Sequence, residues 1–400
     1  MSIKSKMPLQ VWILTLSAFA IGTAEFVIAG VLPQVAGSLG ITEGQAGNLI
    51  TAYALAIVVG GPILTLWLAR FETRRVLIGL MALFIAGNLI GAVTTNYTLL
   101  LISRVIAGLT QGPFYGIGAV VATKVVSDKL AGQAVGQMFA GLTLANVLGF
   151  PAGTWIGNAL GWNMTFLVIS ALGLIATLAI AVLVPAQGRD NTVASIRGQL
   201  IAFRDRNLIA SLAITALGWV GFMTFYGYIA PVARIAGFSA GDLTWVLVIV
   251  GVGLVIGNTL GGRTADANLR LSLMLWPAAM IVSLVVAGFV APFKWPFLAA
   301  AFVFGIASFA NVPPMQMRVM KYGKAAPELA ATANISAFNI ANALGGLIGG
   351  AVIDSSFGAN AIPFAAAIVP AIGLLFILTQ ERGGSAGPAL SRPSLKEATL

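Results

Sequence analysis

Apolar runs of about twenty residues recur along the whole chain, and this feature restricts the fold more than any other. A helix needs about 20 predominantly apolar residues to cross the hydrocarbon core of a bilayer, and its backbone polar groups must be satisfied within the crossing segment. The runs span approximately 9–32, 46–69, 76–94, 97–122, 132–158, 162–184, 207–231, 243–262, 270–291, 296–317, 328–353 and 360–379. They predict an all-α polytopic membrane protein with twelve transmembrane helices.

Composition agrees with this prediction and excludes a water-soluble domain. Hydrophobic residues make up 58% of the 400 residues and charged residues 8%, whereas a soluble domain carries roughly a quarter charged residues. The first run also resembles a signal peptide, because the basic segment "MSIKSKM" precedes it and the small residues "IGTA" lie within it. The run resumes as "FVIAGVL" and is long enough to span, which favours an uncleaved first helix.

The longest polar interruption lies between the sixth and seventh runs and divides the chain into two halves of six helices. The predicted organisation is an N-terminal bundle at 1–185, a cytoplasmic linker at 186–206, a C-terminal bundle at 207–380 and a disordered cytoplasmic tail at 381–400.

The two halves also resemble each other in sequence. "LANVLG" recurs as "IANALG" 196 residues later, Pro33 matches Pro231 at an offset of 198, and Gly108 matches Gly305 at an offset of 197. Three matches at nearly one offset indicate a tandem repeat of six-helix units. A parallel repeat of this kind places a substrate site between the halves, near the bilayer midplane.

The positions of the 22 basic residues predict the topology. Both termini and the even-numbered connections carry 19 of them, and the odd-numbered connections carry only Arg234 and Lys294. Because Lys and Arg accumulate on the cytoplasmic side, both termini are predicted to be cytoplasmic. The net charge of +10 is therefore topological, and a nucleic-acid partner is excluded.

Cysteine and histidine are both absent from the sequence. No disulfide can form, and the usual thiolate and imidazole ligands for zinc, copper or haem are missing. A polytopic membrane enzyme is disfavoured, because the commonest bases and nucleophiles are lacking. We therefore predict no metal, no catalytic residue and no cofactor.

Two spans carry stripes of small residues. In 97–122, Arg104 is followed by Gly108 and further glycines at i+4 spacing, so the arginine begins a small-residue face. In 132–158, Gly141, Ala145, Gly149, Gly153 and Gly157 form a second stripe with Pro151 inside it. Close packing of neighbouring helices is the simplest reading of both.

With these motifs the chain resembles the major facilitator superfamily, in its twelve-helix drug:proton antiporter branch. "LWLARFETRR" at 66–75 is similar to the family loop G-x-x-x-D-R-x-G-R-R/K only at its two final arginines, and "GRTADANLR" at 262–270 is similar to the second-half copy. "GFPAGTWIG" is similar to the antiporter motif of drug exporters. "GTAEFVIAGVLPQVA" resembles the first-helix signature of sugar-efflux, chloramphenicol-resistance and purine-efflux permeases.

The resemblance implies a conformational switch and a proton-coupling arginine. The switch residues would be Arg74, Arg75, Gly149, Pro151, Gly153, Gly262, Asp266 and Arg270. The first loop lacks the acid and both glycines of the pattern, so its arginines could equally be topology signals alone. Arg104 matches the R-x-x-x-G pattern of proton-coupled members, and the alternative is an arginine that reaches the interface from near a helix end.

Glu25 is the acid that lies well inside a predicted span. It is about eight residues from Pro33, roughly 12 Å inside the periplasmic end of the first helix. An ionised carboxylate at that depth needs a partner or a water-filled cavity. We interpret Glu25 as the proton-coupling group, and a protonated glutamate in a fixed interhelical hydrogen bond is the alternative.

Aromatic and amide side chains predicted near the midplane suit moderately hydrophobic, uncharged or weakly cationic compounds. The candidates for substrate binding, each of which could instead be core, are Phe26, Tyr53, Gln111, Tyr115, Asn146, Trp219, Phe222, Tyr226, Asn311, Asn334 and Phe338.

The function that follows is export of small, moderately hydrophobic compounds, drugs among them, by alternating access in exchange for protons. The predicted location is the bacterial inner (cytoplasmic) membrane, and the predicted partners are lipid, protons and a small-molecule substrate bound by a monomer. The alternatives are an exporter of a sugar, purine or amino acid, or a proton symporter that imports such a solute. A channel or scaffold fits a repeat with one buried acid poorly.

Overall fold

The computed structural model describes residues 7–68, 70–127, 130–186, 204–324 and 327–383. Within these residues twelve helical stretches are long and apolar enough to cross a membrane, which confirms the predicted number. The helices of the first half are α1 (Leu9–Leu39), α2 (Glu43–Leu68), α3 (Thr73–Val93), α4 (Tyr97–Lys124), α5 (Ala131–Leu144), η2 (Ala145–Gly149), α6 (Phe150–Leu160) and α7 (Trp162–Leu183). Those of the second half are α9 (Arg206–Tyr226), α10 (Ile229–Ile235), α11 (Leu243–Ala267), α12 (Leu269–Val290), α13 (Lys294–Ala310), α14 (Val312–Tyr322), α15 (Pro327–Ile353), η4 (Gly358–Ala361) and α16 (Ile362–Gly383).

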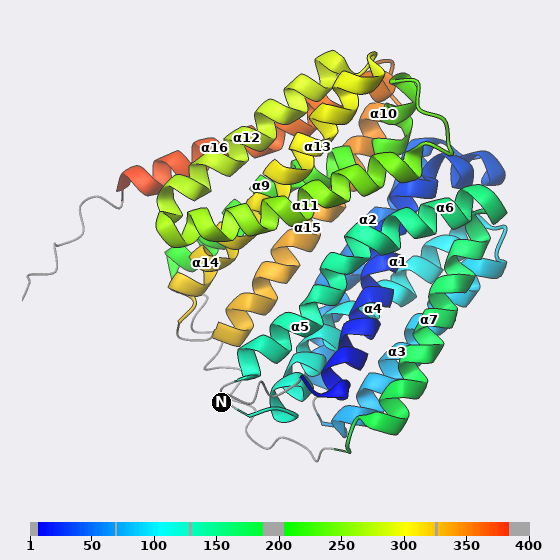
Figure 1. The fold of residues 1–400 in the computed structure, drawn as a ribbon, viewed down its shortest axis with the longest axis vertical. Coiled ribbons are helices and arrows are strands. Elements are labelled where there is room, and N and C mark those ends of the chain that lie inside the picture. The colour runs from blue at the N-terminus through cyan, green and yellow to red at the C-terminus, as the bar shows by residue number, and fades with distance from the viewer. Residues whose placement is uncertain (1–6, 69, 128–129, 187–203, 325–326, 384–400) are drawn as a thin grey trace, which may run out of the picture.

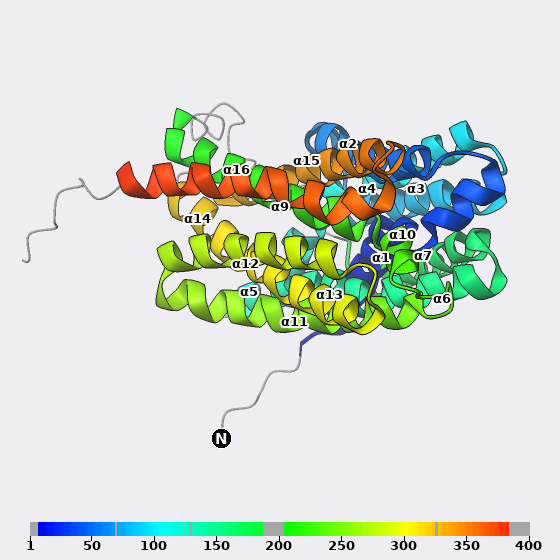
Figure 2. The same ribbon diagram turned by 90° about the horizontal axis from the view of Figure 1, so that it is seen from above.

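The helices gather in two groups, α1 to α7 at the lower right of Figure 1 and α9 to α16 at the upper left, with α15 beside α2 where the groups meet. Figure 2 shows the same two groups side by side from above. Equivalent helices pair in both halves: α2 packs on α4 as α11 does on α13, and α3 packs on α7 as α12 does on α16. The two halves thus share the same helix packing, in agreement with the repeat seen in the sequence.

The first helix is longer than predicted, which changes the depth of Glu25. We expected it to end before Pro33, but α1 continues through this proline to Leu39. Glu25 therefore lies fourteen residues from the end of the helix, about 21 Å rather than 12 Å. The carboxylate is close to the middle of the span, where exposure to lipid would be most costly.

Three predicted continuous spans are interrupted. The helix expected at 207–231 ends at Tyr226 and resumes as α10, and the helix expected at 296–317 ends at Ala310 and resumes as α14. Pro313 and Pro314 follow shortly after Asn311. Each lacks an N–H group, and its ring crowds the preceding turn, so the helix ends there. In the span expected at 132–158, the π-helical turn η2 precedes Pro151, which likewise lacks an N–H group.

Two of the predicted segments lie largely outside the described residues. Of the linker at 186–206 the structure describes 186 and 204–206, and α9 already begins at Arg206. Of the tail at 381–400 it describes 381–383, which are the last turn of α16 rather than disordered chain.

The glycine stripe of the fifth span packs along α1. A Cβ atom on Gly141 would lie 2.2 Å from the main-chain oxygen of Thr15, and a Cβ on Gly153 or Gly157 would lie 2.4 Å from a valine of α1. In the fourth span, Gly108 packs against α2 but nothing lies within 4 Å of a Cβ on Gly116, so this stripe is shorter than predicted. Small residues thus fix the position of the helix that carries Glu25.

We call the end of the bundle that holds Leu9 and Gly383 the terminal end, and the opposite end the distal end. At the distal end the two halves meet through polar contacts. Asp354, which follows α15, accepts hydrogen bonds from the Thr42 hydroxyl at 2.6 Å and from the Gly44 N–H at 3.1 Å, so it caps the start of α2 in the other half. Arg234 also bonds Glu43 across the halves. The distribution of basic residues assigns this end to the periplasm as a prediction.

Replacing Asp354 with alanine is expected to loosen the distal end. The change removes a helix cap shared between the halves, worth about 0.5–1 kcal/mol for a partly exposed site, which corresponds to a two- to fivefold change in population. A single cysteine placed at the buried Thr51, in a chain that has none, should then react two- to fivefold faster with a membrane-impermeant thiol reagent. Asp242→Ala is the control, because Asp242 pairs with Ser239 and Lys294 within its own half. Equal rates in the two variants would contradict the prediction.

Candidate functional site

Glu25 lies where the two halves meet, with 7% of its surface exposed. One carboxylate oxygen, Oε2, accepts a hydrogen bond from Gln111 Nε2 of α4 at 2.8 Å. The other, Oε1, accepts one from Asn342 Nδ2 of α15 at 3.3 Å. Both carboxylate oxygens therefore act as acceptors, one toward each half of the protein. This pattern suits an ionised carboxylate, which has no proton to donate.

Each amide that bonds Glu25 is itself bonded by an aromatic side chain. The Tyr53 hydroxyl donates to Gln111 Oε1 at 2.9 Å, and Trp219 Nε1 donates to Asn342 Oδ1 at 3.0 Å. A continuous chain of hydrogen bonds thus runs from α2 and α4, through α1, to α15 and α9. All of its donors point toward the carboxylate.

Arg104 is buried beside this chain, with 1% of its surface exposed. Its guanidinium lies 4.2 Å from the centre of the Tyr53 ring, and Nη2 donates to the main-chain oxygen of Glu25 at 3.3 Å. Its Nε and Nη1 have no hydrogen-bond partner among the residues that the structure describes. The side chain is turned into the protein rather than toward the interface, and it places a positive charge beside Glu25.

The predicted aromatic residues of the second half form one cluster next to Asn342. The Trp219 and Phe222 rings stack with their centres 4.4 Å apart, Phe338 meets Trp219 edge-on at 5.1 Å, and Tyr226 stacks on Phe222 at 4.8 Å. Phe26 of α1 reaches Tyr226 from the other half at 6.3 Å. The cluster packs directly against the carboxylate region, so an apolar body bound near Glu25 would contact these rings.

The remaining four predicted substrate residues lie apart from Glu25 in the hydrogen-bond network. Tyr115 donates to the Ala18 main chain at 3.2 Å, and Asn334 bonds Gln316 of α14 at 2.6 Å. Asn146 and Asn311 each bond a carbonyl of their own helix and leave Oδ1 without a partner. Tyr115 and Asn334 are therefore held by neighbouring helices, although Asn334 Oδ1, like the other two amide oxygens, has no partner among the described residues.

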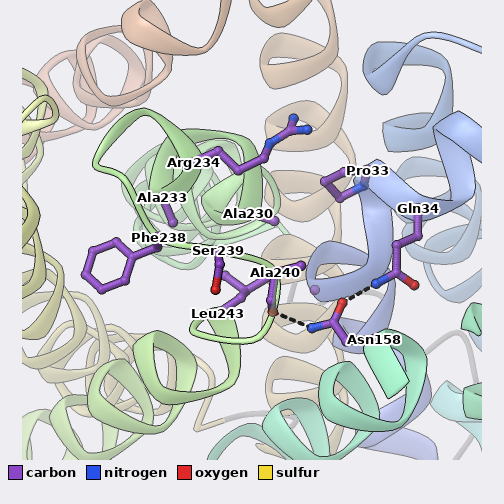
Figure 3. Close-up of a pocket in the computed structure, with 11 residues that line it drawn as sticks. Pro33, Gln34, Asn158, Ala230, Ala233, Arg234, Phe238, Ser239, Ala240 and Leu243 are labelled. Carbon is purple, nitrogen blue, oxygen red and sulfur yellow. Dashed lines mark hydrogen bonds between the residues drawn. The ribbon is translucent and has the colours of Figure 1, made fainter. Parts of the chain in front are cut away.

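The larger of the two described cavities, about 190 Å³, lies at the distal end rather than at Glu25. Figure 3 shows Gln34 bonded to Asn158, which in turn donates to the Ala240 carbonyl of the other half at 2.6 Å. Arg234 lies at its upper rim in that view, beside Pro33. The predicted substrate residues line neither of these two cavities.

The predicted switch residues are spread over two regions. Gly149 and Gly153 pack on Thr23 and Val27 of α1, next to Pro151 at the π-helical turn. Near the terminal end, Arg74 bonds the Ala181 carbonyl of α7, and Arg75 pairs with Glu72 at 3.0 Å. A Cβ on Gly262 would meet nothing within 4 Å, and the side chains of Asp266 and Arg270 lie near the α11–α12 connection.

Asn342 is the site residue that the sequence interpretation missed. It occupies, in "IANALG", the position that Asn146 occupies in "LANVLG", and only Asn146 was selected. Applying the repeat offset of 196 to Asn146 would have identified it. Asp354 and Tyr228 were also missed, because their inter-half contacts leave no mark in the local sequence. Tyr228 donates to the Gly346 carbonyl at 2.8 Å, between α2 and α15.

Twelve spanning helices in two similarly packed halves, with a buried carboxylate bonded to both, define a membrane transporter. The chain belongs to the Major Facilitator Superfamily, whose sequence model matches residues 14–334. It is a transporter and not an enzyme.

Similar proteins match this chain over nearly its full length. The chain is 39% identical over 370 residues to the inner membrane transport protein YdhP of Escherichia coli strain K12, covering 92% of this chain and 95% of that protein. It is 30% identical to a chloramphenicol resistance protein of Streptomyces lividans (92% and 95% covered) and 30% identical to a probable sugar efflux transporter of Mannheimia succiniciproducens (92% and 93%). Among solved structures, the D-xylose–proton symporter has the same fold, with a TM-score of 0.77 at 16% identity and coverage of 93% and 97%.

Proposed function

We propose that the protein is a proton-coupled secondary transporter that exports small, moderately hydrophobic compounds in exchange for protons. The observation that carries this proposal is the position of Glu25, a buried carboxylate bonded to both halves. A group that gains and loses one proton at this point changes its charge where the halves must separate. The similarity to a chloramphenicol resistance protein supports efflux.

Alternating access follows from the same placement. Facing the periplasm, Glu25 would take up a proton, lose its charge and release the substrate; facing the cytoplasm, it would return the proton and bind substrate again. The proton gradient is then the energy source and no cofactor is required. We place the protein in the bacterial inner membrane, with both termini in the cytoplasm on the distribution of its basic residues, and we propose that it acts as a monomer.

The proposal is tested in everted membrane vesicles whose interior has been acidified. Addition of a moderately hydrophobic test compound such as chloramphenicol should partly dissipate the pH gradient, because each transport cycle returns protons to the outside. The gradient should recover when the compound is removed. Compound uptake that leaves the gradient unchanged would contradict proton antiport, and compound efflux from these vesicles would contradict export.

A sugar or another polar metabolite is the second candidate substrate. Amide oxygens of Asn146 and Asn311 without partners, together with the flat ring of Trp219, offer hydrogen bonds and a stacking face that a sugar would use. The relative named as a probable sugar efflux transporter supports this class. Competition in the same vesicles distinguishes the two. If the substrate is a sugar, its analogues should compete with it and block dissipation of the pH gradient, and chloramphenicol should not.

A further inference from the structure

The hydrogen bond between Asn342 and Glu25 joins the two halves near the middle of the spans, far from the polar contacts at the distal end. Asn342 has 4% of its surface exposed, so its amide must find partners inside the protein. Trp219 Nε1 is a donor only, which fixes Asn342 Oδ1 as its acceptor. The Asn342 NH₂ group is therefore the part that faces Glu25, and the amide cannot turn over without leaving the indole N–H unpaired.

The partner on the other side of the carboxylate has more freedom. Gln111 is oriented by the Tyr53 hydroxyl, which can donate or accept. The Ile21 carbonyl lies 3.4 Å from that hydroxyl and offers a second place for its proton. Gln111 can therefore turn over, accept a hydrogen bond from protonated Glu25 through its Oε1 and donate from its NH₂ group to the Tyr53 hydroxyl, without leaving a buried donor unpaired.

This asymmetry decides where a proton on Glu25 can lie. A proton on Oε2 faces Gln111, which can turn over to accept a hydrogen bond from it, whereas a proton on Oε1 faces the NH₂ group of Asn342, which cannot turn over. The proton therefore belongs on Oε2. Oε1 is then the oxygen of a neutral acid, and the bond from Asn342 loses its charge assistance, which is roughly half of its strength.

We propose that Asn342, held in one orientation by Trp219, is the positioning residue through which protonation of Glu25 weakens the link between the two halves. The proposal rests on the proposed function, in which Glu25 carries the proton. A substrate that bonds Glu25 would displace Asn342 and have the same effect. The two halves of the empty transporter with ionised Glu25 then stay linked. Only protonation or substrate binding weakens this link, as strict exchange requires.

The other titratable groups around Glu25 belong to its own half. Arg104 and Tyr115 lie on α4 and Tyr53 on α2, while Tyr226 of α9 reaches α1 only through the ring of Phe26. The described parts of α5, η2, α6 and α7 that pack on α1 contribute amide, hydroxyl and apolar side chains. Arg234 of α10, which also packs on α1, pairs with Glu43 at the distal end. A change in the protonation of Glu25 therefore affects the second half through Asn342.

The absence of cysteine allows a direct test, because spin labels can be placed at two introduced cysteines alone. Thr95 and Ser356 are exposed residues of distal connections, one in each half. In the otherwise unchanged protein without substrate, the label distance should be single at alkaline pH, and a longer distance should appear on acidification. Asn342→Leu should show the longer distance already at alkaline pH, with its population raised about tenfold. Asn339→Leu is the matched control, because Asn339 is equally buried on α15 but bonds its own helix, and it should behave as the parent protein does.

A second variant has an effect of opposite sign. Trp219→Phe keeps an aromatic ring but removes the indole N–H, so Asn342 can turn over and accept a hydrogen bond from protonated Glu25. The halves should then stay linked at acidic pH, and the longer distance should be lost. The proposal is overturned if Asn342→Leu matches Asn339→Leu, or if Trp219→Phe opens on acidification as the parent protein does. If Glu25→Gln retains proton-driven transport, the proposed function is wrong. The label distances in the Asn342→Leu and Trp219→Phe variants test the role of Asn342 separately from that result.

Discussion

Glu25→Gln is expected to reduce transport driven by a pH gradient to the background of empty liposomes, in a protein that remains folded. The new amide has nearly the same volume and can accept from Asn342 while it donates to Gln111, which is free to turn over. The variant therefore keeps both interhelical hydrogen bonds. It cannot gain or lose a proton, so no proton gradient can drive the cycle.

The measurement is uptake into proteoliposomes with an imposed pH gradient, compared with exchange of labelled for unlabelled substrate at equal pH. Exchange requires no net proton movement, so it should persist at a measurable rate, although a slower one because the neutral side chain binds substrate more weakly. Asp242→Asn supplies the control, since it makes the same acid-to-amide change in an exposed cap at the distal end. Accumulation of substrate against a gradient by Glu25→Gln would show that Glu25 is not the coupling group.

Gly141→Ala is expected to destabilise the protein by about 1–3 kcal/mol, although it adds a single methyl group. The new Cβ would lie 2.2 Å from the Thr15 main-chain oxygen and 2.9 Å from Ala18 Cβ, so α5 and α1 would have to move apart. This movement would also stretch the bond from the Thr15 hydroxyl to the Gln137 carbonyl, now 3.0 Å. Because α1 carries Glu25, transport should fall together with stability.

Thermal unfolding in detergent, followed by the loss of monodisperse protein, measures this effect. Gly136→Ala is the matched control on the same helix, because a Cβ there meets nothing within 4 Å. It should be neutral or slightly stabilising, since alanine is the better helix former. If the two variants unfolded at the same temperature, close packing of α5 on α1 would not be a source of stability.

The sequence alone predicted the number of spanning helices, their approximate bounds and the lone buried acid. These features follow from the thickness of the bilayer and from the cost of placing polar groups in it, which act on each segment separately. Glu25 could be selected because a charge inside an apolar run is visible without any knowledge of its neighbours. The glycine stripe of the fifth span was visible for the same reason, although its partner helix was not.

Only the tertiary structure decided which polar residues meet Glu25. Asn146, Asn311, Asn334 and Asn342 are all asparagines in apolar spans, and nothing local distinguishes the one that bonds the carboxylate from three that do not. The direction of the hydrogen bonds from Tyr53 and Trp219 also depends on contacts between distant helices. The same holds for Asp354, which caps a helix 310 residues away in the chain. A span is specified by its own residues, but a site between two halves is specified by the packing of segments that share no local sequence.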